Sequence, residues 1–303
     1  MEIIEFDLHN VPHFEKGISL ALGNFDGMHL GHNEVLFETL YRGEADSAIL
    51  FLSPSQEAKE NLAFLKLDCL MSEDDKIGFA KNKGFDYALV CHCDFSFFSL
   101  SSEEFMDKVL DKLNPKEIFC GEDYSFGNGG KGNPSLLRTR YQVHEILLLM
   151  KNSEKVSSTR IRSLIEEGNI EEAVELLGHP YQIRGLAKEG ERRGTCLGFP
   201  TANLSLLDSY VLPAPGVYYG YGYVNGVAHP AIINYGNNPT FDNKAATLEA
   251  HLIGYQGLPL YNKTVYLSFL GFLRKEIRFE NAEELAKQIQ IDKETALRKL
   301  GVN

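Results

Sequence analysis

The chain has 303 residues, of which 44% are hydrophobic and 24% charged, a composition typical of a soluble globular protein and a length that favours two domains over one. Its formal charge of -12 argues against a general nucleic-acid binder, because neutralising phosphates requires clustered Lys and Arg. The apolar runs fall far short of the roughly 20 residues that span a bilayer, and acids stand where a secretory signal carries basic residues, so we expect a cytoplasmic protein without a membrane partner.

The first half of the chain, from about residue 17 to 150, alternates short apolar runs with amphipathic stretches. Strands are expected at 18–22, 48–52, 87–91, 117–120 and 144–149, with helices at 34–40, 74–83 and 103–113. This alternation predicts a Rossmann-like α/β domain with a parallel, doubly wound sheet, whose ligands bind at the carboxyl ends of the strands. Residues 158–177 predict two helices broken at Gly168-Asn169, and the expected domains are 1–180 and 181–303.

The second half has a different hydrophobic pattern. Apolar and small residues alternate from Val217 to Tyr223, and Asn225-Gly226 separates this run from a second one at 227–235. An Asn-Gly pair between two strands predicts a type I′ hairpin, because both central residues need φ > 0. Further strands at 247–255 and 264–272 predict an antiparallel barrel. Asn281 with Glu284 resembles a capping box, and a C-terminal helix is expected to pack on the barrel through an apolar stripe formed by Leu285, Ile289, Ala296 and Leu300.

Five cysteines in a chain of this length predict no disulfide framework, and we expect them to be reduced. The sequence Cys91-His92-Cys93 places two thiols on one face of a strand. No second Cys/His pair follows at zinc spacing, which favours buried structural cysteines over a metal site.

The first candidate site follows the first core strand, where residues 23–32 read Gly-Asn-Phe-Asp-Gly-Met-His-Leu-Gly-His. Glycines let a backbone approach a ligand closely, and His29 and His32 lie at a helix N-terminus, which favours anions. Two imidazoles there suit triphosphate binding and charge stabilisation at the α-phosphate. Taken alone, the two histidines are also compatible with an ordinary β-α turn.

The whole string resembles the signature of the FMN adenylyltransferase half of prokaryotic bifunctional riboflavin kinase/FMN adenylyltransferases, the FAD synthetase family. Residues 121–127 are similar to its G-x-D-F-x-F-G loop, with Tyr124 in place of Phe, and residues 156–162 to its S-S-T-x-I-R motif. The resemblance implies flavin contacts for Asp123 and Phe126, and it implies an ATP site formed by Gly23, Asn24, Asp26, His29, His32, Asp123, Ser158, Thr159 and Arg162, in which His29 and His32 are catalytic.

The chemistry of these residues agrees with the resemblance. Ser158 or Thr159 can cap a helix whose free N–H groups hold phosphate, and Arg162 can neutralise phosphate oxygens. The phosphate of FMN is already anionic at pH 7, so its attack on ATP needs positioning and charge stabilisation rather than a base.

The sequence departs from the family after the second core strand, where an F-[DE]-P-x-P segment is usual. Ser53 stands where the acid would be, and Gln56 stands where the second proline would be. Because proline fixes φ and restricts the residue before it, we expect a looser loop here, weaker FMN binding and an adenylyltransferase that lags behind the kinase.

The second candidate site lies in the predicted barrel domain. Residues 194–203 resemble the riboflavin kinase signature G-x-x-L-G-F-P-T-A-N. The resemblance implies that Thr201 and Asn203 help to bind Mg²⁺ and that these two residues, with Gly198 and Pro200, bind ATP. Hydroxyl and amide oxygens suit a hard cation that keeps some of its waters. Alone, the Pro-Thr-Ala-Asn segment is also compatible with a turn and an Asn cap.

Two further segments, 236–241 and 248–252, are similar to the family's G-x-x-P-T-F and E-x-H-[LI] patterns. Leu248, Ala250 and Leu252 are expected to face the core, with Glu249 and His251 on the opposite face. The resemblance implies that Glu249 is the base that accepts the proton of the riboflavin 5′-hydroxyl, and that Arg274 lies near the flavin. By itself, Glu249 is also compatible with a solvent-facing strand residue.

The family implies two activities: phosphorylation of riboflavin to FMN and adenylylation of FMN to FAD, both with ATP. Two alternatives stay open at this point. The kinase could be active beside an impaired or regulatory N-terminal nucleotide-binding domain, or the protein could bind flavin without catalysis. The expected partners are the small molecules ATP, riboflavin and FMN, without nucleic acid, and the oligomeric state is open.

Overall fold

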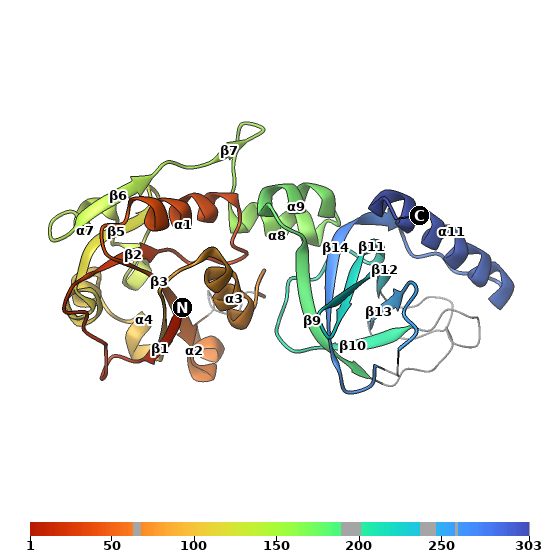
Figure 1. Cartoon of the computed structure of the whole chain (residues 1–303), viewed down its shortest axis with the longest axis horizontal. Coiled ribbons are helices and arrows are strands. Elements are labelled where there is room, and N and C mark those ends of the chain that lie inside the picture. Colours follow the sequence, from red (N-terminus) through yellow and green to blue (C-terminus); the bar gives the residue numbers. More distant parts are fainter. Residues whose placement is uncertain (63–67, 189–200, 237–246, 258–259, 303) are drawn as a thin grey trace. The chain divides into compact units, whose positions relative to one another are not determined.

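The computed structural model describes residues 1–62, 68–188, 201–236, 247–257 and 260–302 (Figure 1). The chain forms two compact units, Met1–Ser157 and Ser158–Asn303. The helices α8 (Ser158–Glu166) and α9 (Ile170–Leu177) belong to the second unit, where Glu171 accepts a 3.2 Å hydrogen bond from the Phe272 N–H. The division at residue 180 stays a proposal about the domain boundary.

The first unit is built on a parallel six-stranded sheet in the order β1-β4-β3-β2-β5-β6, as the alternating pattern predicts. The chain passes from β2 to β3 and β4 on one side and returns to β5 and β6 on the other. The crevice at the carboxyl ends of β2 and β5 is therefore the topological switch point, where doubly wound sheets bind ligands. The strands are β1 (Glu2–Phe6), β2 (Ile18–Leu22), β3 (Asp46–Pro54), β4 (Tyr87–Cys93), β5 (Pro115–Gly121) and β6 (Gln142–Ile146).

Apolar side chains cover both faces of this sheet. As a result, every residue of the central strand β2 is buried. Leu20 and Leu22 belong to one core cluster, and Ala21 belongs to the other. The covering helices are α1 (Leu30–Arg42), α2 (Gln56–Asn61), α3 (Glu73–Lys83), α4 (Phe95–Phe98), α5 (Ser102–Phe105), α6 (Asp111–Leu113) and α7 (Pro134–Leu137).

Several boundaries differ from the sequence-based expectation. The single helix expected at 103–113 is divided, because a π-helical turn at Met106–Leu110 separates α5 from α6. The strand expected at 144–149 ends at Ile146, and a short hairpin of β7 (Met150–Lys151) and β8 (Glu154–Lys155) follows it. The edge strand β1 has an irregular burial pattern and no period that would predict it.

The segment Ser53–Gln56 is regular rather than loose. Ser53 and Pro54 continue β3, opposite His92 and Cys93 of β4. The Ser55 N–H donates to the Cys93 carbonyl at 2.8 Å, and the Ser55 hydroxyl caps α2 by accepting from the Ala58 N–H at 3.1 Å. The prediction of a loosened loop is wrong, because strand pairing and a serine N-cap fix the segment without the second proline.

The second unit is a closed six-stranded antiparallel barrel in the order β10-β13-β12-β11-β14-β9, as predicted. Asn225 and Gly226 have φ values of 51° and 79°, which agrees with the predicted type I′ turn. The strand expected at 247–255 ends at Leu252. The strands are β9 (Tyr181–Lys188), β10 (Ala202–Leu206), β11 (Gly216–Val224), β12 (Val227–Gly236), β13 (Thr247–Leu252) and β14 (Thr264–Arg274).

The C-terminal helix α11 (Ala282–Leu300) lies along the outside of the barrel (Figure 1), where Ile289 and Ala296 pack with Val217 and Ile232. Its cap is Asn281, whose side chain accepts from the Glu284 N–H at 2.9 Å. The other half of the expected capping box differs, since the Glu284 carboxylate accepts from the Glu280 N–H at 3.3 Å instead of the Asn281 N–H.

Candidate active sites

The loop after β2 is strained where it enters the switch-point crevice. Phe25 and Met28 adopt left-handed φ values of 49° and 44°, although both side chains are fully buried. Such conformations cost free energy for large residues and persist only where the surroundings enforce them. A Cβ at Gly23 would lie 2.9 Å from the Phe25 ring, so this position requires glycine. The strain marks the loop as a candidate site.

The two histidines of this loop form one stacked unit at the start of α1. His29 is the N-cap, and its Nδ1 accepts from the His32 N–H at 3.2 Å. Their ring centroids lie 3.6 Å apart, and the Phe25 ring meets the edge of His32. Nδ1 of His32 is buried and is one of two side-chain atoms without a hydrogen-bond partner among the residues described. Its hydrogen-bonding capacity is therefore unused within the described residues, which is unusual for a buried polar atom.

His32 is neutral at physiological pH. Its pKa lies well below the ordinary value of 6.5, first because burial disfavours the charged ring and then because of the positive charges of His29, Lys76 and Lys155. A neutral imidazole can donate or accept a hydrogen bond but brings no net charge. Fixed positive charge for any phosphate group bound here must then come from other side chains.

Asp26, expected at the ATP site, is buried and holds a second loop in place. Its carboxylate accepts hydrogen bonds from the Leu70 N–H at 3.0 Å and the Met71 N–H at 3.3 Å. Nζ of Lys76, on α3, lies 3.8 Å from Asp26 Oδ1. Asn24, in contrast, is exposed.

The loop after β5 lies at the other side of the switch point. Asp123 forms an ion pair with Lys155, which comes from β8. Phe126, expected to contact flavin, is packed in the core against Phe105, and the ring of Tyr124 stacks on it at 5.7 Å. Asp123 is thus exposed on the loop after β5, whereas Phe126 supports the loop from beneath.

Ser158, Thr159 and Arg162 all lie in the first two turns of α8, in the second unit. An ion pair between Arg160 and Glu172, 2.8 Å long, ties α8 to α9. The helix therefore presents the hydroxyl and guanidinium groups of the S-S-T-x-I-R motif from a fixed element.

In the barrel, a row of polar residues crosses neighbouring strands. Asn203 of β10 stands opposite Glu249 of β13, which in turn stands opposite Asn234 of β12. Lys188 of β9 extends the row on the other side of Asn203. Directly opposed residues share one face of the sheet, with Cβ atoms about 5 Å apart. The predicted base and one predicted metal-binding residue are therefore neighbours.

The alternation along β13 confirms the expected orientation, since Leu248, Ala250 and Leu252 are buried whereas Glu249 and His251 are only partly covered. The Thr247 hydroxyl lies 3.4 Å from Glu249 Oε1. Thr201 is exposed at the start of β10, while Gly198, Pro200 and residues 237–241 lie outside the described residues. Amide, hydroxyl and carboxylate oxygens in this arrangement fit Mg²⁺, which prefers oxygen ligands.

Arg274, expected near the flavin, is paired with a residue of α11. Its guanidinium donates to both carboxylate oxygens of Asp292 at 2.8 to 3.0 Å, and Gln288 donates to the same carboxylate at 2.9 Å. Asp292 is 4% exposed. This buried pair ties the end of β14 to α11, so that the arginine anchors the helix.

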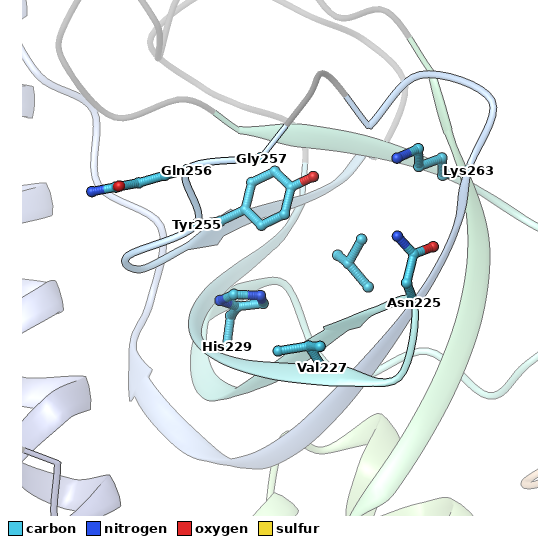
Figure 2. A pocket seen from close by; sticks show the side chains of 8 residues that line it. Asn225, Val227, His229, Tyr255, Gln256, Gly257 and Lys263 are labelled. Atoms are coloured by element: carbon cyan, nitrogen blue, oxygen red, sulfur yellow. The ribbon is translucent and has the colours of Figure 1, made fainter.

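A hollow opens at the barrel end that carries the Asn225-Gly226 hairpin (Figure 2). Tyr255 and His229 line one side and Asn225 and Lys263 the other, with Val227 at its base. The backbones of Ala187 and Lys263 are hydrogen-bonded at 2.9 Å, so the hollow lies at the end of β9 from which the chain leaves toward the kinase signature. It can take a flat apolar group, with an ammonium at its rim.

Sequence reasoning missed three charged residues: Lys76, Lys155 and Asp292. The two lysines have no local signal, because their partners Asp26 and Asp123 are distant in sequence. Asp292 had one. It falls on the apolar stripe of α11, three residues after Ile289 and four before Ala296, and an acid on a buried stripe indicates a buried ion pair.

Comparisons with known proteins cover both units. The family model for FAD synthetase matches residues 11–162, and that for riboflavin kinase matches residues 177–300. Proteins described as bifunctional riboflavin kinase/FMN adenylyltransferase are 32% identical in Listeria monocytogenes, over 91% of this chain and 90% of that protein, and 30% identical in Escherichia coli, over 95% of each.

A crystal structure described as a macrolide-efflux protein from Streptococcus pneumoniae shares the fold with a TM-score of 0.84 and 28% identity, over 97% of this chain and 98% of the other. Its description concerns that protein. Within the described part of this chain, no helix is both long enough and apolar enough to cross a bilayer. The two family matches are consecutive and together account for most of the sequence.

Proposed function

We infer that this chain, which belongs to the bifunctional riboflavin kinase/FMN adenylyltransferase family, phosphorylates riboflavin to FMN and adenylylates FMN to FAD. ATP is the donor implied by both activities. Both family matches extend across the predicted motifs, and this favours two working activities over a kinase with a regulatory domain or a flavin binder without catalysis.

For the kinase step, the observation that carries the proposal is the cross-strand row of Asn203, Glu249 and Asn234. A hydroxyl is a poor nucleophile, so a carboxylate that accepts its proton speeds its attack on the γ-phosphorus of ATP. Glu249 takes that role, and Lys188 and Asn203 lie on the same face beside it. Bound Mg²⁺, held by Thr201 and Asn203, would neutralise phosphate charge.

The nucleotide and flavin ends of the kinase site are assigned to two other parts of the barrel unit. The hollow beside Tyr255 and Lys263 supports binding of the adenine end of ATP, since it is apolar with a cation at the rim. Arg274 shapes the flavin end by holding α11 against the barrel, beside the strand that carries Asn234.

For the adenylylation step, the nucleophile is the FMN phosphate, and no base is required. The strained loop at the switch point positions His29 and His32, which donate hydrogen bonds to the α-phosphate as charge develops there. Ser158, Thr159 and Arg162 are proposed to bind the departing diphosphate, a role that rests on their match to the family motif. Cys91, Cys93 and Cys120 are free thiols, which supports a cytoplasmic location.

The test is turnover of the full-length protein with riboflavin, ATP and Mg²⁺, followed by chromatography. We expect FMN first and FAD after it, and FAD alone when FMN replaces riboflavin. If only FMN forms, the N-terminal domain is regulatory; if neither forms, the protein binds flavin without catalysis. Omitting Mg²⁺ should abolish FMN formation, and restoring it should recover the rate.

A further inference from the structure

We propose that Lys76 is a positioning residue of the adenylyltransferase site: through its ion pair with Asp26 it fixes the strained loop that carries His29 and His32, and it supplies fixed positive charge beside them. This inference rests on the proposed adenylyltransferase function of the first unit. It concerns a lysine that no motif of the sequence singles out.

The geometry begins with Asp26, which sits between the two left-handed residues Phe25 and Met28. Its carboxylate is 4% exposed and accepts N–H groups from Leu70 and Met71. A buried carboxylate is stable only if hydrogen bonds and an opposite charge compensate for lost hydration. Lys76 is the cation placed to do so, with Nζ 3.8 Å from Oδ1 and a side chain 17% exposed.

Lys76 is held in place by its helix. Ser72 is the N-cap of α3, and its hydroxyl accepts from the Asp75 N–H at 3.2 Å, which fixes the first turn next to the Leu70–Met71 segment. Asp26 thus contacts both the Leu70–Met71 segment before α3 and Lys76 within α3. If Lys76 is removed, Asp26 loses this ion pair, and the loop loses a contact that compensates for its backbone strain.

The second link is electrostatic. The charged and titratable groups that act on His32 are His29, Lys76 and Lys155, and its aromatic neighbour is Phe25. Because His32 is neutral at pH 7, the charge that steadies a triphosphate must come from groups that stay cationic. Lys76, whose Nζ lies 3.8 Å from the Asp26 carboxylate, can contribute positive potential at the histidines while it keeps its ion pair with Asp26.

The experiment compares Lys76→Met and Lys76→Arg with wild type, and uses Lys81→Met as the matched control, because Lys81 is an exposed lysine of the same helix. FAD formation is measured from added FMN and ATP, FMN formation from riboflavin reports that the barrel unit is intact, and thermal unfolding reports that the first unit is folded. Lys76→Met should lower kcat/KM for FAD formation about 10- to 100-fold and spare FMN formation. Lys76→Arg should restore most of the loss, and Lys81→Met should match wild type.

A pH titration separates positioning and charge from mere packing. Imidazole NMR signals of His32, and the pH profile of FAD formation, should move to higher pH in Lys76→Met, since a nearby positive charge is gone. Asp26→Asn should also slow FAD formation but move the titration to lower pH, because Lys76 is then uncompensated. If Lys76→Met does not fold, Asp26→Asn takes its place as the test of the ion pair.

The outcomes are distinct. If wild type makes no FAD, the proposed function fails and the lysine is irrelevant to it. If wild type makes FAD and Lys76→Met equals Lys81→Met, the inference is overturned. It is also overturned if Lys76→Met and Lys76→Arg are equally slow with an unchanged His32 titration, because Lys76 then serves packing alone.

Discussion

The candidate sites of the two units are built from different parts of their folds. The α/β unit uses a strained loop and a helix N-terminus, and its key imidazole is buried and neutral. The barrel uses side chains at opposed positions of adjacent strands, with a carboxylate at the centre. The difference agrees with the proposed nucleophiles: an FMN phosphate is already an anion and needs positioning, whereas a ribityl hydroxyl needs a base.

The sharpest test of this contrast is Glu249→Gln. It removes the only carboxylate of β13 and should lower FMN formation by roughly 10² to 10⁴-fold, the range for a lost general base. FAD formation from added FMN should be nearly unchanged, because that step uses no base. The measurement is kcat for each step in the full-length protein. Glu283→Gln, an exposed glutamate of α11, is the control, and normal FMN output from Glu249→Gln would remove Glu249 from its role.

The converse change is His32→Ala. It removes a half-buried imidazole that is proposed to contact the α-phosphate, and it should slow FAD formation by on the order of 10² to 10³-fold, by analogy with one lost oxyanion donor. FMN formation should be spared. His9→Ala, an exposed histidine of the same unit, is the control. Equal loss of both activities would contradict the assignment of the two steps to separate sites.

A third comparison concerns stability. Asp292→Asn leaves the Arg274 guanidinium without its anion and should destabilise the barrel unit by about 1 to 3 kcal/mol, less than a fully buried pair because Arg274 keeps some exposure. The expected sign is a lower unfolding midpoint, measured by calorimetry, with a raised KM for riboflavin as α11 loosens. Asp292→Asn combined with Arg274→Met should recover part of the stability. A double variant as unstable as the sum of the two single variants would argue against the pairing.

The smallest expected effect is on the unfolding free energy of the α/β unit at acid pH, through Glu117. Glu117 is buried; burial alone would raise its pKa, but hydrogen bonds from the Glu44 N–H, Ser19 and His144 outweigh it, and the pKa is net lowered. A carboxyl whose pKa is lower in the folded state stabilises the fold above its unfolded pKa of 4.5, and this contribution is lost as pH falls through the folded value.

Glu117→Gln should therefore flatten the fall in unfolding free energy below about pH 4.5. Chemical denaturation at a series of pH values, followed with a probe in the first unit, measures it. Glu122→Gln, in the same unit, is the control. Parallel pH curves for wild type and Glu117→Gln would show that Glu117 carries no such linkage.

Local patterns predicted what depends on neighbours in sequence. The φ preferences of Asn225 and Gly226 fix the hairpin. The helix-breaking pair Gly168-Asn169 separates α8 from α9, and strand alternation sets the face on which Glu249 lies. Predictions failed where a partner from elsewhere decides the outcome. The segment at Ser53 is regular because β4 pairs with it and Ser55 caps α2, although its own sequence has lost the proline that would stiffen it.

By itself, the sequence determined the fold class of each half, the family and the motifs that match it, because these depend on periodicity and on contiguous residues. Only the tertiary structure decided which charges compensate each other. Asp26 meets Lys76, Asp123 meets Lys155 and Arg274 meets Asp292 through folding, and the burial of each pair sets how strongly it acts. The free energy of an ion pair depends on distance and hydration, and neither is written in the local sequence.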